Sequence, residues 1–278
     1  MEPKFQRRVQ RYGWDKAAGS YERFWERQLA PAHERLLLLA AIQAGERVLD
    51  VACGTGLVTF RAAELAGVAG AVMATDISEG MVSRLLEEAG ARGLAGITAA
   101  RMDAESLDVP AGAYDVALCA LGLMYVPDPV AALRAMLRAL RPGGRAVAAV
   151  WGARKNCGWA EIFPIVDARV QSDVCPMFFS LGTGDRLADA FAAAGFTAIT
   201  TERISTVLHY DCAADACGAA FEGGPVALAY SRFDGPTREA AHAEYLASIE
   251  PWRTGEAYDV PGEFVITAGR SAAITSRE

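Results

Sequence analysis

A glycine turn after a strand-like run could bind a ligand through backbone groups. The strand-like run 47–51 leads through Ala52 into Gly54 and Gly56, and a helical pattern follows at 57–66. Glycine lets the backbone approach a ligand closely, and the start of a helix offers free N–H groups. In an open α/β sheet, ligands bind at the carboxyl ends of the strands, where this turn would lie.

Two carboxylates follow the next two strand-like runs. Asp76 closes the run 71–75, and Asp103 comes after the run 96–101. A carboxylate at the end of the second strand can accept both hydroxyls of a ribose, and Asp103 could meet an adenine amino group. Each acid alone could be a helix cap or a solvated loop charge. The turn and both acids in this order indicate a site for an adenosine-containing cofactor without a 2′-phosphate.

A dinucleotide cofactor is the weaker interpretation of the same turn. The dinucleotide fingerprint needs G-x-G-x-x-G/A, in which the last small residue holds the helix against the strand. Counting from Gly54, the last position is Thr59; counting from Ala52, the first glycine is missing and Leu57 stands last. Neither register matches, which disfavours an NAD-dependent enzyme.

The elements that must position these residues alternate between strand and helix. Strand-like runs at 47–51, 71–75, 96–101, 114–119 and 145–151 are separated by helical patterns at 57–66, 81–89 and 130–140. This alternation predicts an α/β fold with right-handed crossovers and a parallel sheet covered on both faces. A helix at 185–194 and strands at 198–207 and 263–269 continue the pattern. The segments 152–182 and 208–261 interrupt it.

Composition restricts the class of partner. The chain has 278 residues and a net charge of -7, which gives no general attraction to nucleic acid. Its longest purely apolar stretch, 36–42, is too short to cross a bilayer. The N-terminal residues offer no apolar stretch of the secretory type, so we expect a cytoplasmic protein that does not bind membranes. Whether it forms a homodimer stays open.

Aromatic residues concentrate outside the predicted nucleotide-binding body. Of 24 aromatic residues, only Phe60, Tyr114 and Tyr125 lie between residues 36 and 150. Aromatic-rich flanks around a core of alanine, valine and leucine are consistent with a separate apolar cap. Aromatic packing at the edges of the sheet explains the distribution equally well.

The cysteines and histidines give no metal-site pattern. The six cysteines form no C-x-x-C pair, and there are three histidines, so we expect no metal and reduced thiols. Cys157, Cys175, Cys212 and Cys217 raise the alternative of a thiol or metalloid substrate, although their spacing matches no arsenite-type set.

Taken together, residues 46–151 resemble the class I S-adenosylmethionine-dependent methyltransferases, in their small-molecule branch. The resemblance rests on Val48-Leu49-Asp50-Val51-Ala52-Cys53-Gly54-Thr55-Gly56, Ala74-Thr75-Asp76-Ile77-Ser78, Met102-Asp103-Ala104 and Leu140-Arg141-Pro142-Gly143-Gly144. It implies a Rossmann-like sheet of seven strands with helices on both faces. It also implies a helical lid at 1–35 and a methyltransferase domain at 36–278, whose cap insertions at about 152–182 and 208–261 build the acceptor pocket.

The resemblance further implies where S-adenosylmethionine would bind. Twelve residues are implied as its contacts: Trp14, Tyr21, Asp50, Ala52, Gly54, Gly56, Asp76, Ile77, Met81, Asp103, Ala104 and Leu121. The glycine turn and Asp50 would line the methionine end, and Asp76 would hold the ribose. Met81, Asp103 and Ala104 would meet the adenine, and Leu121 would face the sulfonium. Trp14 and Tyr21 would cover the cofactor from the lid.

The implied activity is methyl transfer to a small, partly apolar acceptor. In-line displacement mainly requires that the two reactants be held together in the absence of water. His33, His209, Tyr21 and Tyr125 could each remove a proton, but no catalytic residue is assigned. The segments that mark the quinone-methylating subgroup are not found. A non-catalytic module that binds S-adenosylmethionine and contacts proteins through its flanks is the alternative.

Overall fold

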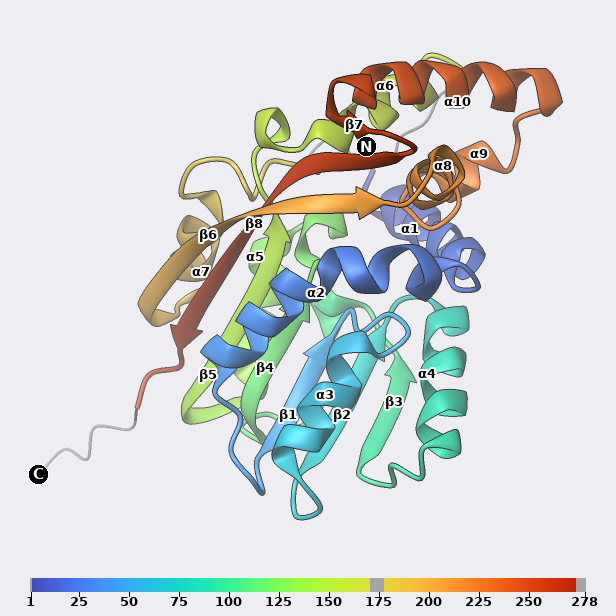
Figure 1. Ribbon diagram of the computed structural model, residues 1–278. Helices are drawn as coiled ribbons and strands as arrows, with labels where there is room; N and C mark the ends of the chain where they lie inside the picture. The colour runs from blue at the N-terminus through green and yellow to red at the C-terminus, as the bar shows by residue number, and fades with distance from the viewer. Residues whose placement is uncertain (1, 171–177, 274–278) are drawn as a thin grey trace, which may run out of the picture.

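The computed structural model describes residues 2–170 and 178–273 (Figure 1). The strands are β1 (Arg47–Val51), β2 (Ala71–Asp76), β3 (Ile97–Arg101), β4 (Tyr114–Ala120), β5 (Leu140–Trp151), β6 (Thr197–Tyr210), β7 (Arg253–Thr254) and β8 (Ala257–Arg270). The helices are α1 (Pro3–Ala17), α2 (Tyr21–Ala40), α3 (Leu57–Ala66), α4 (Glu79–Ala91), α5 (Pro129–Ala139), α6 (Ile162–Asp167), α7 (Arg186–Ala194), α8 (Ala213–Phe221), α9 (Ala227–Tyr230) and α10 (Gly235–Ile249). Short 3-10 turns connect some of them: η1 (Ala104–Ser106), η2 (Leu123–Tyr125), η3 (Arg154–Asn156), η4 (Gly158–Glu161) and η5 (Glu250–Trp252).

The strands form one sheet in the order β3-β2-β1-β4-β5-β8-β6, and β7 pairs with β8. The β1–β2, β1–β4, β2–β3 and β4–β5 pairs are parallel. The expectation of a wholly parallel sheet is wrong at one strand, because β8 lies antiparallel between β5 and β6. The Rossmann-like sheet with helices on both faces is confirmed, with seven strands in its main path.

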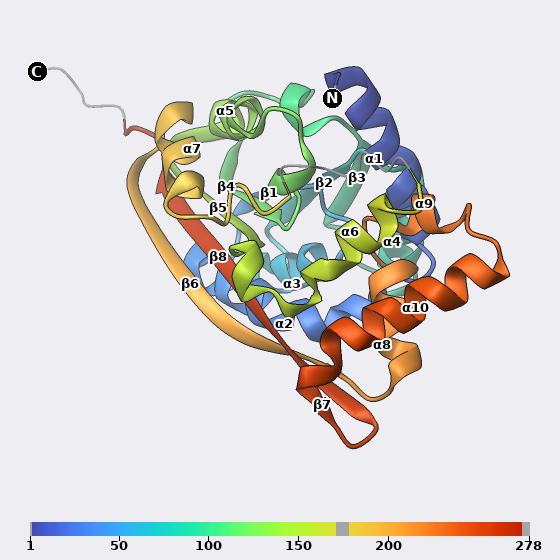
Figure 2. The ribbon, with the colours of Figure 1, turned by 90° about the horizontal axis from the view of Figure 1, so that it is seen from above.

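Helices cover the two faces of this sheet. In the view from above, α2 and α3 lie on one face and α5 and α7 on the other (Figure 2). The central strands are therefore buried on both sides: Val48, Leu49, Val116, Leu118 and Val147 are all inaccessible to solvent. Such strands are almost continuously apolar, as expected for parallel strands between two layers of helices.

Local signals explain where several helices begin. The side chain of Ser78 accepts the N–H of Met81 at the start of α4, and Asp128 accepts the N–H of Ala131 at the start of α5. These caps satisfy backbone donors that have no partner within the helix. Pro129 at the first turn of α5 adds the preferred φ angle.

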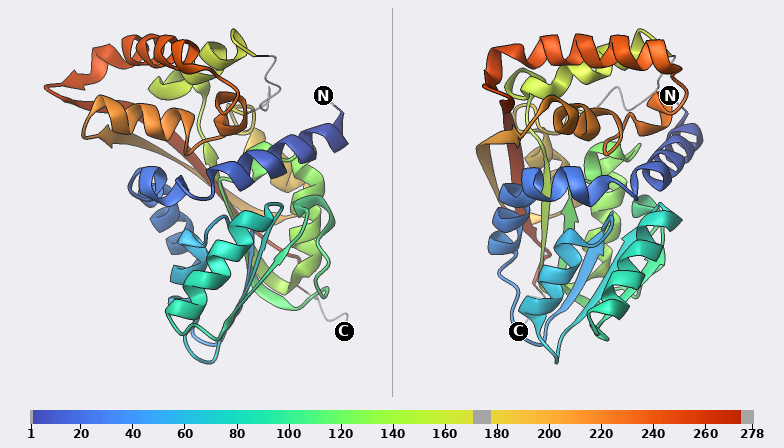
Figure 3. Two further views of the ribbon diagram at one scale, coloured as in Figure 1. Left: turned by 90° about the vertical axis from the view of Figure 1, so that its right-hand side faces the viewer. Right: turned by 45° about the vertical axis from the view of Figure 1, so that its right-hand side comes forward.

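The two segments that interrupt the strand–helix pattern lie above the carboxyl ends of the strands (Figure 3). The first continues from β5 through η3, η4 and α6, and its residues 171–177 lie outside the described part of the chain. The second is shorter than predicted. Residues 208–210 extend β6 and residues 257–261 extend β8, so the insertion contains α8, α9, α10 and β7.

The N-terminal residues form two helices that join the sheet to this upper layer. α1 packs against α4 and α9, and α2 packs against the strands β4, β5, β6 and β8. The boundary predicted at residue 35 falls within α2, which is one continuous helix. The division into lid and main domain stays a prediction.

Candidate active site

A cavity lies at the carboxyl ends of β1, β2 and β4, at the point where the strand order reverses. Ligands bind at this place in open α/β sheets. The cavity is closed by α1, by the start of α2 and by the cap. Its lining residues are Arg7, Gln10, Trp14, Tyr21, Trp25, Leu29, Ala52, Gly54, Asp76, Ile77, Met81, Met102, Asp103, Ala104, Ala120, Leu121, Gly122, Met124, Tyr125, Val126, Pro127, Trp151, Trp159, Phe178, Gly224 and Pro225.

The loop after β1 has a backbone suited to close contact with a ligand. Ala52, Gly54 and Gly56 all have positive φ angles, of 57°, 56° and 103°. A Cβ atom on Gly54 would meet only the Tyr21 ring, at 3.9 Å, so the space above this glycine is free. At Gly56 the added atom would lie 2.8 Å from Phe60, which means that the helix after the turn requires glycine there.

The loop after β4 also has an unusual backbone. Leu121 has φ of 60°, a conformation that is uncommon for a residue with a branched side chain. The next residue, Gly122, packs directly on Ala52: a Cβ atom at Gly122 would collide with the Cβ of Ala52 and lie 3.0 Å from the Cys119 sulfur. The floor of the cavity is therefore built where the first and fourth strands end side by side.

Asp76 connects the ends of β2 and β1. Its Oδ2 accepts the N–H of Gly54 at 3.0 Å, and its Oδ1 accepts the N–H of Ser78 at 2.9 Å. Burial raises the pKa of this carboxyl, and the backbone N–H groups oppose the shift by favouring the ionised form. Each oxygen keeps a lone pair, so Asp76 can still accept hydrogen bonds from a diol.

Asp103 already has partners at the far end of the same wall. Its Oδ1 accepts the N–H of Glu105, and its Oδ2 lies 2.8 Å from Nε of Arg7. Arg7 also pairs with Glu105, at 2.6 Å. The guanidinium of Arg7 thus connects α1 to Asp103, the residue predicted to contact the edge of the adenine.

Asp15 holds α1 against the start of α4. Its Oδ1 accepts the Ser78 hydroxyl at 2.6 Å and the N–H of Gly80 at 3.1 Å. In the preceding residue of the same helix, the Trp14 ring lies edge-on to Tyr21 and Tyr125, with centroid distances of 5.7 and 5.1 Å. These contacts keep α1 over the cavity.

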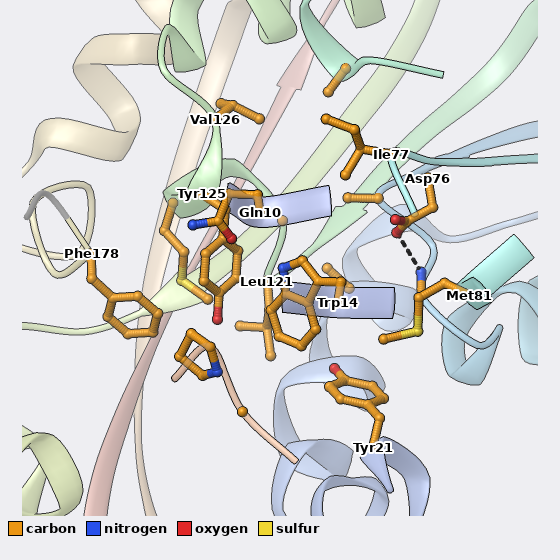
Figure 4. A pocket seen from close by; sticks show the side chains of 18 of the residues that line it. Gln10, Trp14, Tyr21, Asp76, Ile77, Met81, Leu121, Tyr125, Val126 and Phe178 are labelled. Carbon is orange, nitrogen blue, oxygen red and sulfur yellow. Dashed lines mark hydrogen bonds between the residues drawn. The ribbon is translucent and has the colours of Figure 1, made fainter. Parts of the chain in front are cut away.

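Aromatic rings form the walls of the half of the cavity that lies opposite Asp76, Ile77 and Met81; this half is called the acceptor half. Figure 4 shows Tyr125 and Phe178 on one side of the pocket and Asp76, Ile77 and Met81 on the other. Trp151 and Trp159 meet edge to face at 4.9 Å, and Trp159 meets Phe178 at 5.7 Å. These rings pack on one another and also line the cavity. That they belong to a separate cap stays a prediction.

Ten of the twelve predicted contact residues line this cavity, and Asp50 and Gly56 do not. Asp50 lies beneath the loop, with 1% of its surface exposed. Its Oδ2 accepts the Thr59 hydroxyl at 2.6 Å, and its Oδ1 has no hydrogen-bond partner among the described residues. Burial raises its pKa to about 7. These two residues support the loop that lines the cavity.

Several lining residues were not predicted. Arg7, Gln10 and Trp14 occupy one stripe of α1, with the spacing that places residues on one helix face. That spacing, starting from Trp14, could have identified the first two. Met124 and Val126 come from the connection between β4 and α5, and Pro225 comes from the loop between α8 and α9.

The candidate proton acceptors differ in position. Tyr21 and Tyr125 line the cavity, whereas His33 and His209 do not. Burial and the negative charge of Asp76 raise the pKa of Tyr21, which opposes its ionisation. Burial lowers the pKa of His33 to about 4.

The cysteines do not assemble a thiol site in the described residues. Burial raises the pKa of both Cys157 and Cys217 to about 12, so these groups stay as thiols at neutral pH. Cys175 lies outside the described residues. No group of three or more histidine, cysteine, aspartate or glutamate residues in the described part of the chain could hold a metal ion.

Comparison with known proteins identifies the family. A family model described as a methyltransferase domain matches residues 48–144. A UbiE ubiquinone/menaquinone C-methyltransferase from Ectopseudomonas oleovorans is 38% identical over 136 residues, which cover 47% of this chain and 74% of that protein. The chain belongs to the class I S-adenosylmethionine-dependent methyltransferase family.

Other relatives are named for the small molecules that they methylate. An aklanonic acid methyltransferase from a Streptomyces species is 36% identical over 132 residues, or 48% of this chain and 60% of that protein. The chain spans about half the length of other curated relatives that it matches. A solved structure of Haemonchus contortus phosphoethanolamine N-methyltransferase 2 in complex with S-adenosyl-L-methionine has the same fold, with a TM-score of 0.61 and 17% identity over 93% of this chain and 57% of that one. No helix in the described residues is long and apolar enough to span a membrane.

Proposed function

We propose that this methyltransferase binds S-adenosylmethionine in the cavity and transfers its methyl group to a small, partly apolar acceptor. One observation carries the proposal: residues from α1, from α2 and from the loops after four different strands line one cavity at the reversal of the strand order. These segments are the ones that the sequence assigns to the cofactor.

The residues present fit this cofactor. Asp76 would hold the ribose hydroxyls with the lone pairs left by its two backbone hydrogen bonds. Ile77 and Met81 offer apolar surface beside it, and Asp103 and Ala104 would hold the adenine edge. The open space over Gly54, beside Ala52, would receive the methionine end.

The chemistry also fits a site without a dedicated base. When bound, the sulfonium supplies an electrophilic methyl group. The chain's own residues hold the acceptor in line and keep water out, and effective orientation alone supplies a large part of such a rate enhancement. Trp14 and Tyr21 cover the site from α1 and α2. Leu121 presents an apolar side chain at the sheet end.

The nature of the lining argues for a small molecule as acceptor. The net charge of -7 does not favour a nucleic acid, and Arg7 is the one cation among the described residues that line the cavity. The half-buried and buried aromatic rings of the cap favour an acceptor with apolar surface. The relatives named for methylation of aklanonic acid and of quinone precursors agree with this class.

Two measurements test the proposal. Titration calorimetry should detect binding of S-adenosylmethionine and no binding of NAD. Incubation with a panel of phenols, amines and thiols, together with arsenite, should then release S-adenosylhomocysteine. Binding without turnover on any acceptor would favour the non-catalytic module, and turnover only with thiols or arsenite would favour the metalloid alternative. Absence of S-adenosylmethionine binding would refute the proposal.

A further inference from the structure

No described residue in the acceptor half of the cavity carries a formal charge. Among the described residues that line the cavity, only Arg7, Asp76 and Asp103 carry a formal charge. Arg7 is paired with Asp103, and Asp76 lies on the wall assigned to the ribose. A phosphorylated acceptor would need an unpaired cation, and an ammonium would need a free carboxylate. The inference that follows rests on the proposed function, which assigns the half of the cavity that contains Asp76 and Asp103 to the cofactor.

Aromatic rings that meet edge to face form the walls of this half. Trp151, Trp159 and Phe178 line it, together with Tyr125, and neighbouring rings meet at centroid distances of 4.9 to 5.7 Å. Rings prefer offset or edge-to-face contacts with other rings. A planar, unsaturated acceptor would extend this arrangement, whereas a flexible chain would lose conformational entropy for the same contact.

Gln10 introduces a polar group into this apolar region. Its residue surface is 6% exposed. Among the described residues, none forms a hydrogen bond with the side-chain amide of Gln10. Protein atoms also do not shield this amide fully from the surrounding space. Since Gln10 lines the cavity, its amide is open to the cavity space.

The position of Gln10 on α1 fixes the direction in which it faces. Gln6, one turn earlier, donates its side-chain N–H to the Tyr125 carbonyl at 3.2 Å, and Trp14, one turn later, contacts the Tyr125 ring. Residues four apart share a helix face, so Gln10 faces Tyr125 as well. Figure 4 shows its amide on the side of Tyr125 and Phe178, away from Asp76.

Other buried polar groups at the cavity differ from Gln10. The indole N–H groups of Trp25 and Trp159 have no partner among the described residues, but neighbouring atoms shield them from the cavity space. Gln10 can both donate and accept a hydrogen bond. A ligand that fills the cavity would remove this amide from water, so a ligand oxygen that hydrogen-bonds it avoids the cost of an unpaired polar group.

We infer that Gln10 is a specificity-determining residue that hydrogen-bonds an oxygen substituent of an uncharged, planar aromatic acceptor. An oxygen on the ring can serve as donor or acceptor to the amide, while the ring lies among Tyr125, Trp159 and Phe178. A site built to bind a hydroxyl discriminates strongly against the analogue that lacks it, because its polar group is then left without a partner.

The experiment compares two probes that differ by one oxygen. Binding of 1-naphthol and of naphthalene is measured by tryptophan fluorescence in the presence of S-adenosylhomocysteine, whose own binding is measured first by calorimetry. The natural protein should bind 1-naphthol roughly tenfold to a hundredfold more tightly than naphthalene. Gln10→Leu should reduce that preference to less than about threefold by weakening only 1-naphthol. Phosphoethanolamine and sarcosine should not compete.

A matched control is Gln28→Leu. Gln28 is also a buried glutamine, but its amide donates to the His209 carbonyl and accepts the His209 N–H, and it does not line the cavity. This variant should lose thermal stability and keep the preference for 1-naphthol. Thermal unfolding of Gln10→Leu checks that it folds.

Three outcomes would overturn the inference. The natural protein could fail to bind 1-naphthol, or Gln10→Leu could keep the preference for 1-naphthol over naphthalene. In the third outcome, Gln10→Leu loses as much affinity for S-adenosylhomocysteine as for 1-naphthol, which would assign Gln10 to the cofactor. Absence of S-adenosylhomocysteine binding in the natural protein would instead refute the proposed function. The naphthol comparison would then be made on the protein alone.

Discussion

The carboxylate of Asp76 accepts the backbone N–H of Gly54 at 3.0 Å, which ties the end of β2 to the glycine turn after β1. One side chain therefore shapes the loop assigned to the methionine end and also presents lone pairs to the ribose. The two halves of the candidate cofactor site are coupled through this contact.

We predict that Asp76→Ala reduces the affinity for S-adenosylmethionine by roughly tenfold to a hundredfold, because charged hydrogen bonds to the ligand and the support of Gly54 are lost together. Titration calorimetry measures this change. Asp115→Ala is the control: Asp115 binds the N–H of Arg47 and the side chain of Arg141 at the other end of the sheet. Unchanged affinity in Asp76→Ala would argue against the ribose role.

The Asp15 contact predicts an effect on the rate of cofactor release. Its removal in Asp15→Ala frees α1 from Ser78 and Gly80, so S-adenosylhomocysteine should dissociate about tenfold faster, as for the loss of a hydrogen bond to a charged group. Stopped-flow fluorescence measures the rate. Asp234→Ala removes a comparable cap from α10 and should leave the rate unchanged. Equal rates in Asp15→Ala and the natural protein would show that α1 does not retain the ligand.

The contact between Gly122 and Ala52 predicts a steric effect on stability. Gly122→Ala forces the loops after β1 and β4 apart, and overpacking of this kind costs about 1–3 kcal/mol of unfolding free energy. Chemical denaturation measures it. Gly90→Ala is the matched control in α4, where the new methyl group meets nothing within 4 Å; it should be neutral or stabilise by up to about 1 kcal/mol. A tolerated Gly122→Ala would mean that the two loops separate without cost.

Asp50 predicts a pH dependence of stability. Burial raises its pKa from 3.8 to about 7, so between these values the unfolded chain loses the proton and the folded chain keeps it. The contribution of Asp50 to stability therefore falls as pH rises through this range, and the full cost is present above pH 7. Asp50→Asn keeps an acceptor for Thr59 without the charge. The free energy of unfolding of Asp50→Asn should exceed that of the natural protein by an amount that grows from near zero at pH 4 to about 2–4 kcal/mol at pH 8.

Denaturation curves of both proteins at several pH values test this dependence. A stability difference that does not change between pH 5 and pH 8 would contradict a raised pKa of Asp50. If Asp50→Asn is instead less stable than the natural protein at high pH, the folded protein stabilises the ionised carboxylate of Asp50.

The regular α/β part of the fold could be predicted because its signals are local. The runs around β1, β2 and β4 are apolar and end at Gly54, Asp76 or Leu121, and each helix that follows begins with a cap or a glycine. The orientation of β8 could not be predicted. Its pattern is interrupted by Pro261 and Gly262, and pairing between β6 and β8 is decided by contacts far apart in the chain.

The sequence by itself determined which residues could meet an adenosine, since the spacing of Gly54, Asp76 and Asp103 after successive strands brings them to one edge of any parallel sheet. Only the tertiary structure decided that Asp50 lies beneath the loop and that Gln10 opens into the apolar half of the cavity. Local periodicity specifies the face of an element, but the neighbour that covers that face is set by packing between segments distant in the chain.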